Sequence, residues 1–166
     1  MVVKVTYSNF FHSLKMHFDE CRIDECKEKG CRINCDKNKF RHLVIFKGEK
    51  IVKKLHKNIK ICDCFIYCAI GNSLIVALVE LKSKSIKPSK IEEKFRNSVE
   101  KIRCMIDLCD GINTTKIKFF PILLYKSVNP IDIKVISALT IRFEKDGSII
   151  YGKCNSNLFE IIKNYD

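Results

Sequence analysis

The stretch Lys60–Lys82, which reads KICDCFIYCAIGNSLIVALVELK, decides the fold. It contains two runs, 60–68 and 73–82, that are rich in β-branched, aromatic and other apolar residues. The intervening Gly71-Asn72 pair is typical of a tight turn between strands. The stretch therefore predicts a hairpin of two neighbouring, mostly buried strands.

The flanking segments predict a mixed α/β domain. Ser89 as N-cap and Glu92 three residues later form a capping box that opens an amphipathic helix reaching about Cys109. Further elements are expected on both sides: a helix over 8–20, a strand at 42–46 with a turn at Gly48-Glu49 and a returning strand at 51–52, a strand over 116–125, a helical turn or strand over 131–139, a hairpin joining 140–143 to 148–151, and a helix over 156–165. We expect α/β class with an α+β mixed sheet.

Composition indicates one basic domain over residues 1–166. The chain has 31 Lys and Arg against 19 Asp and Glu, which gives a formal net charge of +12. Its 46% hydrophobic residues are enough for a core that needs no disulfides or metals to stabilise it. Such charge favours polyanions, nucleic acid first and an acidic membrane surface second. The apolar stretch Cys64–Leu81 is interrupted at Gly71 and has the charged residues Glu80 and Lys82 at its end, so it does not predict a membrane span. The N-terminal segment does not resemble a signal peptide, and a cytoplasmic location is expected.

Nine of the ten cysteines fall into two groups. Four lie in the polar segment 21–39, expected to be a loop or small knuckle: Cys21, Cys26, Cys31 and Cys35. Four thiolates suit a structural Zn²⁺ or an iron–sulfur cluster, but spacings of four, four and three residues leave free thiols or disulfides, as in hyperthermophile proteins, equally open. Others lie in apolar patterns and are expected to be core residues: Cys62, Cys64, Cys68, Cys104 and Cys109.

Polar residues converge at one end of the predicted hairpin. Strand alternation puts Glu80 and Lys82 on one face, directed away from the packed side that receives Leu81. If the hairpin closes at its turn, Asp63 lies roughly opposite this pair. Two carboxylates and the backbone carbonyl of Leu81 would make an all-oxygen site for Mg²⁺ or Mn²⁺. Lys82 could then orient or deprotonate a metal-activated water.

This arrangement resembles the PD-(D/E)xK, or restriction-endonuclease-like, nuclease superfamily. Asp63, an apolar strand running into Glu80-x-Lys82, a Lys/Ser-rich loop and an amphipathic helix carry the resemblance, which spans about residues 40–125. It implies an α-β-β-β-α-β core with a Cys-rich N-terminal insertion. It also implies Asp63 and Glu80 as metal ligands, Lys82 as the water-positioning residue, and a further acidic ligand from the first helix, for which Glu20 is the candidate and Asp19 the substitute.

The chain departs from the family pattern at two positions. Cys62 stands where the family often has proline before the aspartate. Lys94 occupies the place of a glutamine that many members carry early in the following helix. The chain has no glutamine, which disfavours the DNA-repair subgroup defined by a Gln–Tyr motif.

These observations predict a metal-dependent nuclease that hydrolyses phosphodiester bonds, in DNA in preference to RNA, and a homodimer would suit cleavage of both strands of a duplex. Basic residues near the site are candidates for a phosphate-binding groove or, equally, for a solvated surface: Lys84, Lys87, Lys90 and Lys94. The alternative is a Cys-rich, zinc-holding nucleic-acid-binding module with a non-catalytic nuclease-like fold.

Overall fold

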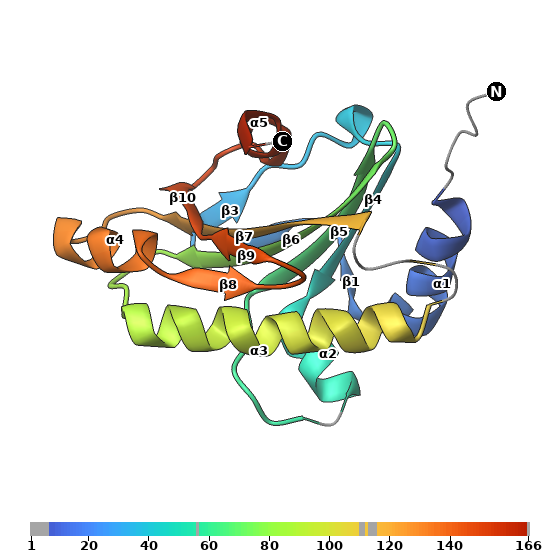
Figure 1. Ribbon diagram of the computed structural model, residues 1–166, viewed down its shortest axis with the longest axis horizontal. Helices are drawn as coiled ribbons and strands as arrows, with labels where there is room; N and C mark the ends of the chain where they lie inside the picture. The colour runs from blue at the N-terminus through green and yellow to red at the C-terminus, as the bar shows by residue number, and fades with distance from the viewer. Residues whose placement is uncertain (1–6, 56, 110–111, 113–115, 166) are drawn as a thin grey trace.

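A six-stranded mixed sheet forms the centre of the molecule in the computed structural model, which describes residues 7–55, 57–109, 112 and 116–165 (Figure 1). The first four strands in the sheet are antiparallel neighbours, whereas the last three are parallel to one another. The strand order is β1 (Arg22–Ile23), β4 (His42–Lys47), β5 (Cys64–Ile70), β6 (Ser73–Lys82), β7 (Ile117–Tyr125) and β10 (Ile150–Lys153). The predicted mixed α/β class is confirmed.

Helices and two small hairpins surround this sheet. The described residues contain five α-helices: α1 (Ser8–Phe18), α2 (Gly48–Lys54), α3 (Pro88–Asp107), α4 (Pro130–Ser137) and α5 (Leu158–Tyr165). Short 3₁₀ turns occur at Asp19–Cys21 and Lys37–Lys39. The hairpins pair β2 (Cys26–Glu28) with β3 (Cys31–Ile33) and β8 (Thr140–Arg142) with β9 (Asp146–Ser148).

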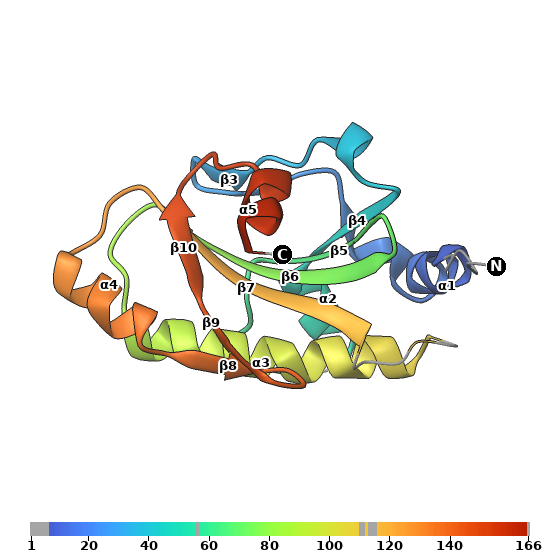
Figure 2. The same ribbon diagram turned by 45° about the horizontal axis from the view of Figure 1, so that its top comes forward.

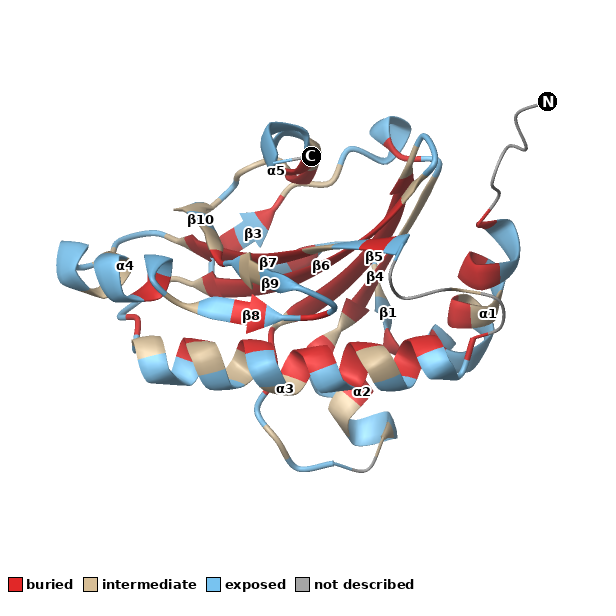
Figure 3. Cartoon of the chain, viewed as in Figure 1, coloured by how far each residue is buried: buried red, intermediate tan, exposed pale blue. Residues whose placement is uncertain are grey.

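Both faces of the central strands are covered. Helix α3 runs along one face, while α5 and the β2–β3 hairpin lie on the other (Figures 1 and 2). Phe95 of α3 packs in one apolar cluster with Tyr67, whereas Leu158 of α5 packs in a second with Val79. Burial runs along almost the full length of β5 and β6 (Figure 3), as expected for central strands between two layers.

The predicted β5–β6 hairpin is confirmed. Its register runs from Cys64 opposite Val79 to Ile70 opposite Ser73, and Gly71 supplies the positive φ of +55° that the tight turn requires. Helix α3 then carries the chain across to β7, which lies parallel to β6.

The predicted capping box of α3 is wrong. The helix begins at Pro88, with Lys87 as its N-cap and no side-chain capping hydrogen bond. Proline suits the first helical position because it has no N–H to leave unsatisfied. Ser89 is therefore already inside the helix, and Glu92 instead accepts hydrogen bonds from Arg96.

Two other segments differ from the prediction. The returning strand expected at 51–52 belongs to helix α2, which buries Ile51 completely. Segment 140–151 does not form one hairpin: β8 pairs with β9, and the chain then joins the edge of the main sheet as β10. The segment expected as a helical turn or strand at 131–139 is largely helix α4.

Disulfides replace the predicted metal knuckle. Cys26 is bonded to Cys64, and Cys31 is bonded to Cys154. Cys21 is a buried free thiol, and the described residues include no group of three or more His, Cys, Asp or Glu side chains that could hold a metal ion. The predicted Zn²⁺ or iron–sulfur site at Cys21, Cys26, Cys31 and Cys35 is therefore wrong, because two of its four thiols are bonded to partners elsewhere in the chain.

Disulfides also bear on the expected compartment. They are typical of oxidising compartments and of intracellular proteins from hyperthermophiles, so a cytoplasmic location stays a prediction. Within the described part of the chain, no helix has the length and apolar character needed to cross a membrane.

Candidate active site

Backbone contacts fix the segment that carries Asp63. The Gly48 N–H, at the start of α2, donates to the Asp63 carbonyl over 2.8 Å. A Cβ atom at Gly48 would lie 2.0 Å from the Cys62 carbonyl oxygen, so only glycine permits this approach. From the other side, the buried Ser98 hydroxyl of α3 accepts the Cys62 N–H at 2.8 Å. Asp63 thus enters β5 from a segment held by two helices.

The Asp63 side chain reaches across to the end of β6. Its Oδ2 accepts a 2.8 Å hydrogen bond from the Leu81 N–H, just beyond the last β5–β6 pair. Burial, followed by the nearby Glu80 charge, raises the pKa of Asp63 to about 6, against opposing contributions from the Leu81 N–H, Lys94 and Lys82. The structure therefore brings Asp63 to the Glu80-x-Lys82 motif, as predicted.

Glu80 is the most deeply buried charged side chain of the candidate site. It is 0% exposed, and its Oε1 pairs with Lys82 Nζ at 2.9 Å and with Lys94 Nζ at 2.6 Å. Its Oε2 is the buried side-chain oxygen that has no hydrogen-bond partner among the described residues. The expectation that Glu80 faces away from the packed side is wrong, because α3 covers that face of β6 and supplies Lys94.

Lys94, predicted as one of the surrounding basic residues, instead forms an ion pair with Glu80 inside the site. Burial opposes its charged form, but the charge and hydrogen bond of Glu80, aided by Asp63, outweigh this and raise the pKa of Lys94. Its ammonium therefore stays charged at neutral pH, beside a carboxylate that has no access to water.

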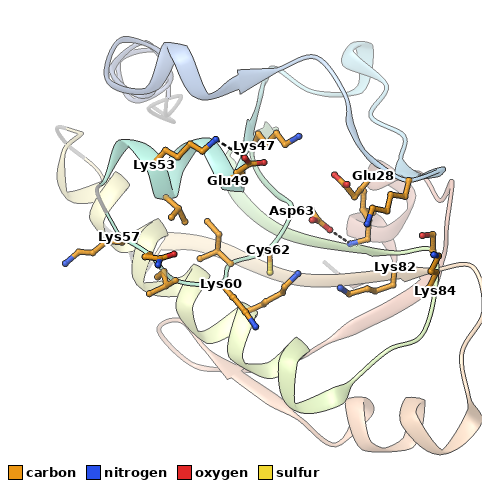
Figure 4. A pocket seen from close by; sticks show the side chains of 18 of the residues that line it. Glu28, Lys47, Glu49, Lys53, Lys57, Lys60, Cys62, Asp63, Lys82 and Lys84 are labelled. Carbon is orange, nitrogen blue, oxygen red and sulfur yellow. Dashed lines mark hydrogen bonds and ion pairs between the residues drawn. The ribbon is translucent and has the colours of Figure 1, made fainter.

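A cleft of about 920 Å³ opens in front of Asp63, Leu81, Lys82 and Lys94. Figure 4 shows Asp63 among lysines from α2, from the segment before β5 and from the end of β6. Eight lysines and three carboxylates line the cleft: Lys29, Lys47, Lys53, Lys57, Lys60, Lys82, Lys84 and Lys94, with Glu28, Glu49 and Asp63. Its charge suits a polyanion.

The other predicted residues lie in several places. Lys84 lines the cleft, whereas the exposed Lys87 and Lys90 are not among its lining residues. Glu20 is exposed and forms an ion pair with Lys54, so the structure does not bring it to Asp63 and Glu80. Leu81 lines the cleft, and the role of its carbonyl stays a prediction.

The sequence analysis did not predict the part of the cleft that segment 47–60 and the β2–β3 hairpin form. Four lysines of segment 47–60 line the cleft together with Lys82 and Lys84, and the density of lysine in this segment was the available signal: Lys47, Lys53, Lys57 and Lys60. The β2–β3 hairpin adds Glu28 and Lys29 to the lining. The Cys26–Cys64 disulfide ties this hairpin to the residue that follows Asp63.

Comparison with known proteins identified no relative of this chain. No model of a protein family matches this chain, and neither a curated protein nor a solved structure does. The functional argument therefore depends on the geometry of the chain's own residues.

Proposed function

We propose that the chain is a metal-dependent nuclease that hydrolyses phosphodiester bonds in DNA. The observation that carries the proposal is the unpartnered Oε2 of Glu80. This carboxylate is fully buried behind the cleft, and its partners Lys82 and Lys94 line the cleft together with Asp63. Buried carboxylate oxygens nearly always have partners, and exceptions often mark a place for an ion. A purely structural ion pair at Oε1 does not explain why Oε2 is buried without a partner among the described residues.

The order of the elements supports the resemblance to the PD-(D/E)xK superfamily. Helix α1, the antiparallel strands β4, β5 and β6, helix α3 and the parallel strand β7 occur in the α-β-β-β-α-β order that the resemblance implies. The short strands β1 to β3 are inserted before β4, and helix α2 is inserted between β4 and β5. The motif residues lie at the start of β5 and the end of β6, where the cleft opens. We propose a restriction-endonuclease-like core on these grounds.

The residues present fit Mg²⁺ or Mn²⁺. Asp63 and Glu80 Oε2 would hold the ion, with the Leu81 carbonyl as a third oxygen. Two carboxylates suffice because Mg²⁺ keeps several of its waters and completes its shell with phosphate oxygens. When bound there, the metal would lower the pKa of a coordinated water and offset the charge that grows on the phosphodiester.

The chain's other residues would position the substrate. Lys82 Nζ is held by Glu80 and is partly exposed to the cleft, so it can donate a hydrogen bond to a phosphate oxygen or to the attacking water. The cleft lysines would bind backbone phosphates and release counterions, which gives affinity independent of base sequence. The burial of Glu80 under α3 excludes bulk water from one side of the reacting group.

Cleavage assays on supercoiled plasmid, single-stranded DNA and RNA, each with Mg²⁺ or with EDTA, test the proposal. The expected result is Mg²⁺-dependent cleavage of DNA that Glu80→Gln and Lys82→Met abolish. Lys90→Met, an exposed lysine outside the cleft lining, is the matched control and should cut at the parental rate. Absence of cleavage of every substrate, or cleavage that persists in Glu80→Gln, would contradict the proposal.

A further inference from the structure

Lys82 and Lys94 bind the same oxygen of Glu80. Their ammonium nitrogens lie 2.9 Å and 2.6 Å from Oε1, whereas Oε2 has no partner among the described residues. Lys82 lies two residues from Glu80 on β6, but Lys94 reaches the site from α3. Two ammonium groups thus bind Oε1, whereas Oε2 stays available to a further ligand.

The charges at this point already balance. Asp63 and Glu80 contribute two negative charges, and the two lysines contribute two positive charges within the same cluster. A buried carboxylate needs such compensation because an unpaired charge without water is costly. A divalent cation would add two more positive charges directly beside the ammonium groups, which repel it.

We infer that Lys94 is a built-in counter-ion, which neutralises Glu80 when no metal is bound and competes with a divalent cation for it. This inference rests on the proposed metal site. Lys94 is the lysine that can leave, because its long side chain comes from a separate element and also lines the cleft, where its ammonium can move. Lys82 is held close to Glu80 by its position on the same strand.

Mn²⁺ affinity in the absence of nucleic acid tests the inference. Titration calorimetry at constant ionic strength compares the parent with Lys94→Met, which keeps most of the side-chain stem but not the charge. We expect Lys94→Met to bind Mn²⁺ about tenfold more tightly or better, because one repelling charge is gone. Lys90→Met changes an exposed lysine one turn earlier on α3 that is not among the cleft-lining residues, and it should match the parent.

Thermal unfolding supplies a second readout. Without metal, Lys94→Met should unfold at a lower temperature than the parent, and Mn²⁺ should raise its midpoint by more than it raises that of the parent. Lys94→Gln keeps a hydrogen-bond donor for Oε1 and provides a second neutral variant if Lys94→Met does not fold.

Equal Mn²⁺ affinity in the parent and both neutral variants, with binding lost in Glu80→Gln, would overturn the inference and leave the proposed nuclease site intact. No Mn²⁺ binding in any variant would overturn the inference and the metal site together.

Discussion

Replacing Asp63 with asparagine should stabilise the fold at pH 8 even though it removes a proposed metal ligand. The carboxylate is partly buried beside Glu80, and its burial, followed by the Glu80 charge, raises its pKa from 3.8 to about 6. Asparagine keeps an oxygen that can accept the Leu81 N–H but carries no charge to bury. A residue that costs stability where it stands is expected at a functional site, since selection there acts on activity.

The size of the effect follows from the raised pKa. A shift of about two pKa units, at 1.36 kcal/mol each, corresponds to about 3 kcal/mol. The folded state binds the Asp63 proton more tightly than the unfolded state, so the carboxyl favours folding below pH 3.8 and loses that contribution as pH rises through about 6. The variant should therefore gain about 3 kcal/mol over the parent at pH 8 and almost nothing at pH 3.5.

Urea unfolding of the parent and of Asp63→Asn at both pH values measures this difference. In a separate thermal unfolding experiment at pH 8, the midpoint temperature should rise by roughly 6–12 °C for a chain of this size. Asp36→Asn is the matched control, because the exposed Asp36 also accepts a backbone N–H, from Asn38, and should change stability by less than about 0.5 kcal/mol. A variant that is no more stable than the parent at pH 8, or gains equally at both pH values, would refute the reasoning.

Three further outcomes can be checked. Gly48→Ala should lower the free energy of unfolding by about 3 kcal/mol, because its Cβ would overlap the Cys62 carbonyl. A change below about 0.5 kcal/mol in urea unfolding would be inconsistent with that contact. Thiol titration of the unreduced, denatured protein should detect six thiols among the ten cysteines, because four are bonded in disulfides; detection of ten would disprove both disulfides. Replacing both Lys57 and Lys60 with methionine should make the log–log dependence of DNA affinity on salt shallower by about two, measured by fluorescence anisotropy, while an unchanged slope would place the DNA elsewhere.

Local sequence patterns were sufficient to predict the central hairpin and its convergence on Asp63. Two apolar runs around Gly71-Asn72 have few other structures open to them, and the register follows from the turn. The pairing of Cys64 with Val79 then places Asp63 and Glu80 next along the two strands.

Long-range packing decided what the sequence could not show. Alternation tells which residues share a face, but in a strand covered on both sides neither face is solvent, and Glu80 is buried under α3. Cysteine connectivity likewise depends on which elements stack, so spacing within 21–39 could not reveal bonds to Cys64 and Cys154. Cys62 and Cys64, both expected to be core residues, are buried in opposite apolar clusters, because Cys62 precedes the strand and does not follow its alternation.

The measurement that tests the central claim most directly is anomalous X-ray scattering from crystals of the protein grown with Mn²⁺. The account predicts one strong peak within coordination distance of an Asp63 carboxylate oxygen and Glu80 Oε2, at the base of the lysine-lined cleft. The same crystals of Glu80→Gln should lack that peak. A peak at another position, or its persistence in Glu80→Gln, would contradict the assignment of Asp63 and Glu80 as the metal site.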